Sequence, residues 1–371
     1  MTWSKKFAAA SIALLLTASV AGCSAGDPES SGGADNAGTT QVKFGLPTNM
    51  GANNAPLAVA QGLGYFEDEG LDVEIVNTGG SSASLQAVLS GQLDIGSATP
   101  EPILQFVESG GGFGGVTMFY NYVRQPTGSL AVLASSDVQS LEDFAGLTIG
   151  NSSLGSGNLI LANGILDSVG LEPDVDFSHI AVGTGAAALQ ALESGQVGAL
   201  SLWDTEYAAM EVQGVELRTF TSPEAAELFS TTYFSSPKYI EDNPEVIEAF
   251  GRAMARATHF TSLDPTAALK VMYETFPETR TGGLDEAAQL ETDLVALNAR
   301  LELLLADDPI ANGNWGEYSP SAVESWTSYA FTSEIVTTEL NADELYTNDF
   351  VEAYNDFDPA EIEADVAEFQ E

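Results

Sequence analysis

Histidine, cysteine and positively charged residues are scarce in this chain. Its two histidines and one cysteine are too few for a zinc site built from Cys and His ligands or for a disulfide within the chain. Lysine and arginine number 11 against 54 aspartates and glutamates, giving a formal net charge of −43. Because so negative a surface repels phosphate, the composition argues against nucleic acid and anionic lipid as partners.

The negative charge is spread over most of the sequence, and no single acidic tail accounts for it. Like charges at this density repel one another and destabilise a compact state unless salt screens them. We therefore predict that the protein works in salty water. The apolar content of 44% is enough for a packed core, and the length of 371 residues favours two domains over one.

Long apolar stretches are also missing, apart from one over residues 7–20 that follows Lys5 and Lys6. As a helix this run would measure about 20 Å, which is shorter than the roughly 30 Å hydrocarbon core of a membrane. A short apolar run behind a positive region is typical of a secretory signal peptide, which we place at residues 1–22. We expect no transmembrane helix elsewhere.

Cys23 gives this leader a more specific interpretation. Residues 20–23, Val-Ala-Gly-Cys, resemble the lipobox of bacterial lipoproteins, and the resemblance implies cleavage before Cys23 and acylation of its thiol. An ordinary secretory signal followed by an unrelated cysteine is the alternative. The next residues are small and polar, so residues 23–40 are predicted to form a flexible tether. We expect an exported protein held by lipid at the extracytoplasmic face of the cell membrane.

A sequence repeat divides the rest of the chain. Residues 85–93 read LQAVLSGQL and residues 189–197 read LQALESGQV. Each copy follows a glycine-rich turn and continues into an apolar run, as expected of a helix with a glycine C-cap and a buried strand behind it. The repeat predicts one β-turn-α-β unit used twice, in two similar lobes. Chance similarity between two alanine-rich helices is the alternative.

Strand and helix patterns alternate around both copies of the repeat. Strands are expected at residues 42–47, 71–77, 93–98, 116–123, 129–135, 147–150, 179–182, 197–203 and 215–220. Helices are expected at residues 56–70, 82–90, 102–109, 156–169 and 206–213. This alternation predicts an α/β fold of two Rossmann-like lobes with mostly parallel sheets. We place the first lobe at residues 41–134 and 235–371 and the second at residues 135–234.

The pattern becomes helical after residue 234. Xaa-Pro pairs that start at Asn243, Asp264 and Asp358 each combine an N-cap residue with proline at the first helical position. Behind the first pair, apolar residues recur at helical spacing from Val246 to Phe260. We expect this helical C-terminal extension to pack on the first lobe.

The most diagnostic stretch is residues 54–73, NAPLAVAQGLGYFEDEGLDV. It resembles the opening of ABC-importer substrate-binding proteins for nitrate, taurine and aliphatic sulfonates, a group that includes relatives binding thiamine pyrimidine precursors. Comparable segments stand at residues 90–96, 140–146 and 202–204. The resemblance implies the type II periplasmic-binding-protein architecture, in which two hinge strands join the lobes and the ligand lies between them. It also implies an ABC permease with a cytoplasmic ATPase as partner, and no cofactor or metal.

Five turns are expected to meet at the cleft, at residues 47–54, 79–82, 98–101, 151–156 and 183–186. In open parallel sheets the carboxyl ends of the strands and the helix N-termini converge on one crevice. Their N–H groups and helix dipoles favour anionic or acceptor groups without any lysine. The predicted polar ligand contacts are Asn49, Asn54, Ser81, Ser82, Thr99, Glu101, Ser152, Ser153, Thr184 and Asp204. The predicted aromatic walls are Tyr120, Tyr122, Trp203 and Tyr233.

Each of these residue types has a structural alternative. Serine and asparagine in turns are commonly caps, and Tyr120 and Tyr122 also fit core positions. Arg124 is suited to a sulfonate or carboxylate of the solute, or to a structural ion pair with one of the many carboxylates. Glu101 and Asp204 suit an amine or amidine. The family's sulfonate binders often have proline where Thr205 stands, so the resemblance does not determine the substrate.

Two other classes of function compete with this interpretation. Residues 183–188 match a G-x-G-x-x-A dinucleotide pattern after an expected strand. However, no G-x-S-x-G motif stands between an expected strand and an expected helix, and the two histidines have no recognisable triad partners. The relatives that make thiamine pyrimidine use a cysteine-rich loop and a site histidine, and this sequence lacks both. We expect no catalysis. A tethered sensor or adhesion protein with the same lobes is the second alternative.

These observations together predict a lipid-anchored receptor. It would capture a small organic nitrogen or sulfur compound by cleft closure and deliver it to a permease as a monomer. The ligand classes left open are sulfonates, nitrate and pyrimidine-like amines.

Overall fold

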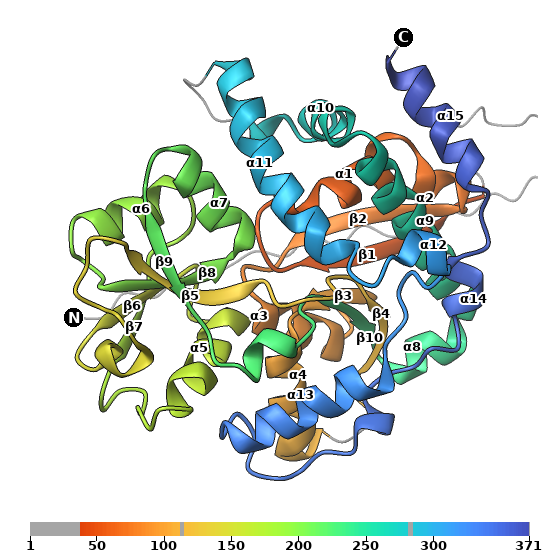
Figure 1. Cartoon of the computed structure of the whole chain (residues 1–371). Coiled ribbons are helices and arrows are strands. Elements are labelled where there is room, and N and C mark those ends of the chain that lie inside the picture. Colours follow the sequence, from red (N-terminus) through yellow and green to blue (C-terminus); the bar gives the residue numbers. More distant parts are fainter. Residues whose placement is uncertain (1–37, 112–114, 281–284, 371) are drawn as a thin grey trace, which may run out of the picture. The chain divides into compact units, whose positions relative to one another are not determined.

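The computed structural model describes residues 38–111, 115–280 and 285–370 (Figure 1). The predicted signal peptide, Cys23 and all but the last residues of the predicted tether lie outside the described residues. Residues from Gly38 onward form one compact unit. None of the helices in the described part is long and apolar enough to cross a membrane.

Two five-stranded sheets form the framework of this unit. The first has the order β2-β1-β3-β10-β4, with β1 at Thr40–Leu46, β2 at Leu71–Asn77, β3 at Ile95–Ala98, β4 at Thr117–Asn121 and β10 at Thr232–Ser235. The second has the order β7-β6-β8-β5-β9, with β5 at Gly128–Leu133, β6 at Thr148–Asn151, β7 at Ser178–Ala181, β8 at Ala199–Trp203 and β9 at Leu217–Phe220. The α/β fold with two lobes is thus confirmed.

The two sheets have the same plan, and the sequence repeat occupies equivalent places in them. In each sheet three strands pair in parallel and two further strands add antiparallel pairs. The sheets are therefore mixed rather than mostly parallel. Helix α3 (Ser81–Leu89) precedes β3, and α6 (Ala186–Glu193) precedes β8. Each pair follows the predicted order of turn, helix and buried strand.

The chain crosses between the sheets earlier than predicted. The first crossing lies between β4 and β5 and the second between β9 and β10. Strand β5, expected in the first lobe, pairs with β8 in the second sheet, while β10 pairs with β3 in the first. Both crossings are irregular segments rather than hinge strands. Sequence patterns show that a strand exists but not which sheet it joins, because its pairing partners are distant in the chain.

Fifteen α-helices are described. The first lobe contains α1 (Ala55–Gly62), α2 (Tyr65–Asp68), α3 and α4 (Pro100–Phe106), and the second contains α5 (Gly157–Asp167), α6 and α7 (Asp204–Val212). The C-terminal third contains α8 (Pro237–Asp242), α9 (Pro244–Leu263), α10 (Pro265–Thr275), α11 (Glu286–Leu304), α12 (Pro309–Asn312), α13 (Pro320–Thr332), α14 (Val351–Tyr354) and α15 (Pro359–Gln370). The three predicted proline starts are those of α9, α10 and α15, and Asp264 caps α10 by accepting a hydrogen bond from the Ala267 N–H.

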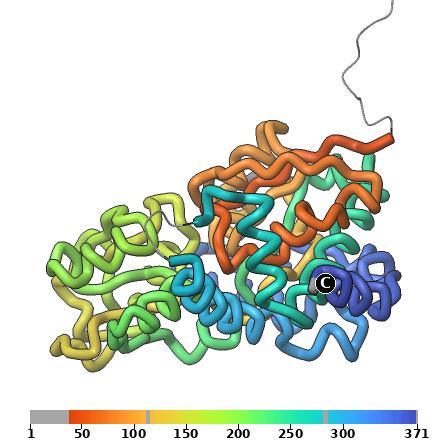
Figure 2. Tube along the Cα trace, turned by 90° about the horizontal axis from the view of Figure 1, so that it is seen from above, coloured from red at the N-terminus to blue at the C-terminus, as the bar shows by residue number. Residues whose placement is uncertain are grey.

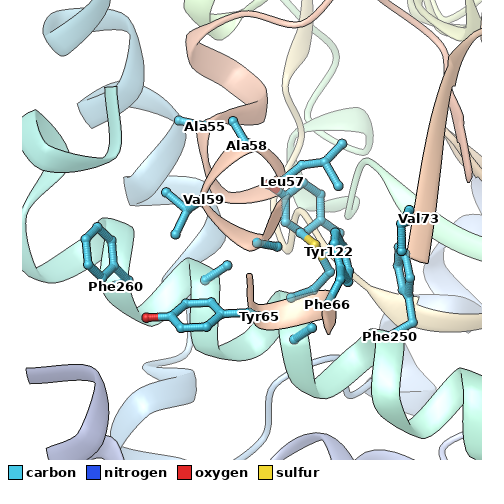
Figure 3. Close-up of a cluster of buried hydrophobic side chains, with 14 of the residues drawn as sticks. Ala55, Leu57, Ala58, Val59, Tyr65, Phe66, Val73, Tyr122, Phe250 and Phe260 are labelled. Atoms are coloured by element: carbon cyan, nitrogen blue, oxygen red, sulfur yellow. The ribbon is translucent and has the colours of Figure 1, made fainter. Parts of the chain in front are cut away.

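Glycine interrupts the helix predicted at residues 56–70. Helix α1 ends at Gly62, and Gly64 has φ 78° before α2 begins at Tyr65. This left-handed conformation costs little for glycine but is unfavourable inside a right-handed helix. The break turns Tyr65 and Phe66 back toward α9, where Phe66 stacks on Phe250 with ring centroids 5.2 Å apart (Figure 3).

The first lobe is built around an aromatic core. Phe44 of β1 packs on Phe250 of α9 at 5.2 Å and edge-on against Tyr233 of β10 at 5.3 Å. Aromatic rings bury a large apolar area and prefer such edge-on or offset contacts. The core thus joins the first sheet to helices from the C-terminal third of the chain.

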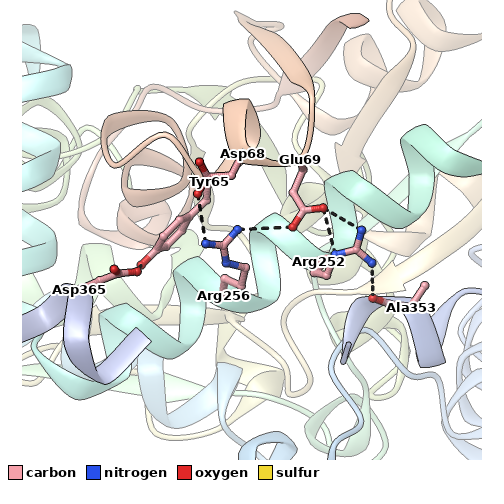
Figure 4. A network of polar contacts seen from close by, with 7 residues as sticks. All are labelled: Tyr65, Asp68, Glu69, Arg252, Arg256, Ala353 and Asp365. Carbon is pink, nitrogen blue, oxygen red and sulfur yellow. Dashed lines mark hydrogen bonds and ion pairs between the residues drawn. The ribbon is translucent and has the colours of Figure 1, made fainter. Parts of the chain in front are cut away.

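A polar network ties α2 to the C-terminal helices (Figure 4). The Glu69 carboxylate accepts hydrogen bonds from Nε and Nη2 of Arg252 at 3.0 and 2.7 Å, and Nη1 of Arg252 donates to a backbone carbonyl of α14. Arg256 lies over the Tyr65 ring at 4.3 Å, and the Tyr65 hydroxyl donates to Asp365 of α15 at 2.8 Å. The network thus joins residues 65–69 to three helices of the C-terminal third, α9, α14 and α15.

The C-terminal extension does not pack on the first lobe alone. Helices α9, α10, α14 and α15 do so, but α11 also packs along α7 of the second lobe. Figure 2 shows α11, in light blue, beside the green segments of the second lobe. Helix α13 likewise approaches α5, because a Cβ placed on Gly164 would lie 2.9 Å from the Tyr329 hydroxyl. The extension therefore connects the two lobes.

Candidate ligand-binding site

A small cavity of about 60 Å³ lies where turns from the two lobes meet. It is lined by Pro47, Thr48, Asn53, Asn54, Gly80, Ser81, Ser97, Thr99, Tyr122, Thr127, Ser152, Ser156, Gly157, Asn158, Trp203, Thr231 and Arg300. A wider groove of about 590 Å³ adjoins it and shares Pro47, Thr48, Asn53, Ser152 and Trp203. We call the first space the inner cavity and the second the outer groove.

Most of the predicted contact residues lie at one of these two spaces. Asn54, Ser81, Thr99, Tyr122, Ser152 and Trp203 line the inner cavity, and Asn49, Ser153 and Thr184 line the outer groove. Seven of them come from the five expected turns, Trp203 ends β8, and Tyr122 follows β4. Ser82, Glu101, Tyr120, Asp204 and Tyr233 line neither space. Whether any of them contacts a ligand stays a prediction.

Two of the expected aromatic walls are core residues. Tyr120 and Tyr233 are fully buried and stack on each other with centroids 5.4 Å apart. Tyr122 stacks on the opposite side, 4.9 Å from Tyr233, and reaches the inner cavity. The buried rings of Tyr120 and Tyr233 therefore support the ring of Tyr122, which lies at the inner cavity.

Trp203 stands at the end of the fully buried strand β8 and lines both spaces. Its side chain is buried, with 7% of the residue exposed, and its Nε1 atom has no hydrogen-bond partner among the described residues. Buried indole N–H groups usually have a partner. Trp203 thus contributes an aromatic side chain to both spaces, while its Nε1 atom is buried without a partner in the described part of the chain.

Arg300 is the charged residue of the inner cavity that sequence reasoning missed. It projects from α11 to the inner cavity with 4% of its surface exposed. Its Nε and Nη2 atoms donate to the two oxygens of Asp204, at 2.8 and 2.5 Å. Burial opposes the guanidinium charge, but the neighbouring Asp204 carboxylate outweighs burial and raises the pKa of Arg300. No local motif marks Arg300, since only the packing of α11 on α7 brings it to the site.

The sequence left two roles open for Arg124, a contact to the solute and a structural ion pair, and in the structure Arg124 makes the structural contacts. Its Nη1 atom donates to the Asn314 carbonyl at 3.2 Å, and Nη2 lies 3.9 Å from Asp307. It lines neither the inner cavity nor the outer groove. Asp204 is likewise paired, with Arg300.

Glu101 lies behind the inner cavity with 1% of its surface exposed. Its Oε2 atom has no hydrogen-bond partner among the described residues. Burial raises the pKa of Glu101 to about 7, although the Thr99 hydroxyl opposes this shift. The carboxyl is close to Gly157, where an added Cβ would lie 3.0 Å from Oε2.

The two lobes touch along a glycine seam formed by Gly80, Gly155 and Gly157. The backbone N–H of Ser82 in the first lobe donates to the Gly155 carbonyl in the second at 3.2 Å. A Cβ on Gly80 would lie 2.8 Å from the same carbonyl oxygen, and one on Gly157 would lie 1.7 Å from Oγ1 of Thr99. The absence of side chains at this seam lets the lobes come together over the inner cavity.

The remaining motifs do not form a catalytic or dinucleotide site in the described residues. His179 is held between Asn151 and Asn163, and burial lowers its pKa to about 4. The Gly185 N–H at the start of α6 donates to the Glu206 carboxylate at 2.6 Å, which places a negative charge where a dinucleotide phosphate would bind. No group of three His, Cys, Asp or Glu residues in the described part of the chain could hold a metal ion.

Relatives of this chain include both binding proteins and enzymes. It is 28% identical over 222 residues to a formylaminopyrimidine-binding protein of Halalkalibacterium halodurans, a match covering 58% of this chain and 64% of that protein. It is 23% identical over 235 residues to a 4-amino-5-hydroxymethyl-2-methylpyrimidine phosphate synthase of Legionella pneumophila, covering 62% of this chain and 71% of that protein. The match to the formylaminopyrimidine-binding protein thus spans less than two thirds of that relative's length.

Solved structures establish the fold. The alkanesulfonate-binding protein from Xanthomonas axonopodis pv. citri, bound to MOPS, superposes with a TM-score of 0.61 at 17% identity. The superposition covers 84% of this chain and 99% of that protein. This chain therefore has the fold of the periplasmic binding proteins. The family model described as NMT1/THI5 like matches residues 51–268, more than half of the sequence, and the chain belongs to that family.

Proposed function

We propose that this chain is the solute-binding component of an ABC importer. It captures a small solute between its lobes, closes over it and delivers it to a membrane permease with a cytoplasmic ATPase. The observation that carries this proposal is the inner cavity, which polar turns of both lobes and the faces of Tyr122 and Trp203 enclose together. A space bounded by both lobes changes when they separate, so binding and closure are linked.

The solute we propose is a nitrogen heterocycle of the pyrimidine type. Trp203 and Tyr122 provide flat aromatic surfaces, and serine, threonine and asparagine side chains provide hydrogen bonds around them. The one cation at the inner cavity, Arg300, is already paired with Asp204. These features favour a neutral aromatic ligand over a sulfonate or nitrate. The similarity to a formylaminopyrimidine-binding protein agrees with this choice.

Calorimetric titration with formylaminopyrimidine tests the proposal. The wild-type protein should bind it and should bind taurine and nitrate much more weakly. Trp203→Phe replaces the indole that lines both spaces by a smaller ring, and it should weaken binding by about tenfold because part of the aromatic wall is lost. Trp315→Phe is the matched control, because Trp315 is buried away from both spaces. Equal binding by both variants would refute the assignment.

We also propose that the protein does not alter its ligand. The inner cavity and the outer groove contain no cysteine or histidine among their described lining residues. Histidine is the most frequent general acid–base group and cysteine is a particularly strong nucleophile, so these spaces lack two of the commonest catalytic side chains. Formylaminopyrimidine should be recovered unchanged after incubation with the protein, as measured by chromatography. Formation of a product would favour the enzymatic branch of the family.

The anchor at Cys23 completes the proposed function. Its support is the lipobox-like sequence at residues 20–23, and the result would be a receptor tethered at the extracytoplasmic face of the cell membrane. Cys23→Ser should release the protein from washed membranes into the soluble fraction. Membrane retention equal to that of the wild type would refute the anchor without affecting the binding proposal.

A further inference from the structure

The inner cavity contains a single charged side chain among its described lining residues, and a carboxylate neutralises it. Arg300 reaches the cavity from α11, while Asp204 stands at the first position of α7, directly after Trp203. Two donors of the guanidinium bind the two oxygens of Asp204. A bidentate pair of this kind between a guanidinium and a carboxylate fixes both groups in one geometry. The charge presented by the pair as a whole is therefore close to zero.

One terminal donor of Arg300 is left over. No hydrogen bond within the described part of the chain uses Nη1. The Trp203 Nε1–H also lacks a partner there, and both residues line the inner cavity. The Nη1 donor of Arg300 can serve an acceptor atom such as a carbonyl oxygen or a ring nitrogen, whereas Nε1 of Trp203 has almost no accessible surface. An anion at the same place would be repelled by the Asp204 carboxylate, which lies on the far side of the same guanidinium.

The surroundings add to this repulsion. The carboxylates of Glu206 and Asp293 line the outer groove, through which a solute would reach the inner cavity. The Glu206 carboxylate is bound to the Gly185 N–H, and Asp293 accepts hydrogen bonds from the Tyr273 hydroxyl at 2.6 Å and from Gln289. No lysine or arginine besides Arg300 lines either space among the described residues. The path to the site thus carries two carboxyl groups at its outer end, and burial raises the pKa of both, so they oppose an anion most strongly at neutral and higher pH.

We propose that Asp204 is a specificity-determining residue, which cancels the charge of Arg300 so that the cavity accepts neutral hydrogen-bond acceptors and rejects anions. This rests on the proposed solute-binding function and defines the charge of its ligand. Arg300 then acts as a directional donor rather than as a counter-ion. Removing the negative charge of Asp204 alone should convert the site to an anion site, because the cation would remain buried and unpaired.

The test compares three forms of the protein, with methanesulfonate and nitrate as probes in a low-chloride buffer. Asp204→Asn keeps the size of the side chain and leaves Arg300 unpaired, so it should bind methanesulfonate at least about tenfold more tightly than the wild type. The double variant D204N/R300Q carries no cation and should show no gain. Equal anion binding by D204N and the wild type would overturn the proposal.

A further measurement decides the question if D204N does not fold. The wild type and Arg300→Gln are titrated with the same anions, and neither should bind them appreciably. Anion binding by the wild type that Arg300→Gln abolishes would overturn the proposal, because it would show that Asp204 does not cancel the cation. Titration with formylaminopyrimidine separates the proposal about the ligand from the proposal about charge selectivity. If the wild type fails to bind it while D204N gains anion affinity, the proposed ligand is wrong and the charge selectivity stands.

Discussion

Replacing Gly157 by alanine tests whether the lobes close through the glycine seam. An added Cβ would lie 1.7 Å from Oγ1 of Thr99 and 3.1 Å from Cβ of the same residue, which belongs to the other lobe. The first distance falls about 2 Å short of a favourable van der Waals contact. Gly157 is the first residue of α5 and its φ is not positive. Alanine therefore suits the second lobe itself, and the conflict arises only when the lobes meet.

The size of the expected loss of affinity follows from the fact that the clash arises only in the closed form. An overpacked contact typically costs about 1–3 kcal/mol, and here that cost falls on the closed form. Because ligand binding requires closure, affinity for formylaminopyrimidine should fall by about 5- to 150-fold. The folded lobes should keep their stability, since alanine is a better helix former than glycine. A closure defect thus differs from a folding defect in leaving the unfolding transition of the free protein unchanged.

Calorimetric titration of two companion variants makes the result specific. Gly155→Ala is the matched control, because a Cβ there would meet only Cβ of Ser82, at an ordinary 3.9 Å. The double variant T99A/G157A removes the clashing hydroxyl and should recover part of the lost affinity. If G157A binds within twofold of the wild type, or if G155A is equally impaired, closure does not depend on the Gly157–Thr99 contact.

Three further predictions concern stability. Because burial raises the pKa of Glu101 to about 7 from an ordinary 4.5, ionisation opposes folding and the free energy of unfolding should fall as the pH rises from 5 to 8. Glu101→Gln should remove up to about 3 kcal/mol of this pH-dependent change, as measured by urea unfolding at each pH. A pH dependence equal to that of the wild type would show that Glu101 does not have the raised pKa. Glu69→Gln breaks a largely buried ion pair with Arg252 and should lower the free energy of unfolding, measured in urea, by about 2 kcal/mol. Asp242→Asn breaks an exposed ion pair with Lys238 and should lower it by at most about 0.5 kcal/mol. The melting temperature should rise between dilute buffer and molar potassium chloride, because salt screens the net charge of −43; a flat salt profile would show that self-repulsion is not limiting.

Local sequence patterns were sufficient for much of the fold. The repeated turn, helix and strand predicted two equivalent lobes, and the Asn243-Pro244 and Asp264-Pro265 pairs marked helix starts correctly. These features depend on neighbouring residues and so leave a local signal. The exchange of β5 and β10 between the expected lobes left none, because pairing with β8 or β3 is decided by residues far away in the chain.

The candidate site likewise combines residues that local patterns predicted with residues that only the tertiary packing brings there. Asn54, Ser81, Thr99 and Trp203 were found because they follow strands or begin helices, where a parallel sheet opens to its cleft. Arg300 was not found, because it lies within the last turns of an ordinary helix and reaches the cavity only through the packing of α11 on α7. The core position of Tyr120 was one of its two alternatives, whereas the burial of Tyr233 left no local signal, since its ring belongs to a stack completed by other elements.

The position of α11 has a consequence for synthesis of the protein. Thr48 and Arg300 face the same cavity although they are separated by most of the folded chain. Domains form progressively as the chain leaves the ribosome, so both sheets can be complete before the last wall of the cavity has been translated. A product that terminates ahead of Glu286 would retain all ten strands but lack the helix that completes the cavity. The capacity to hold a solute is thus acquired late, after the framework around it already exists.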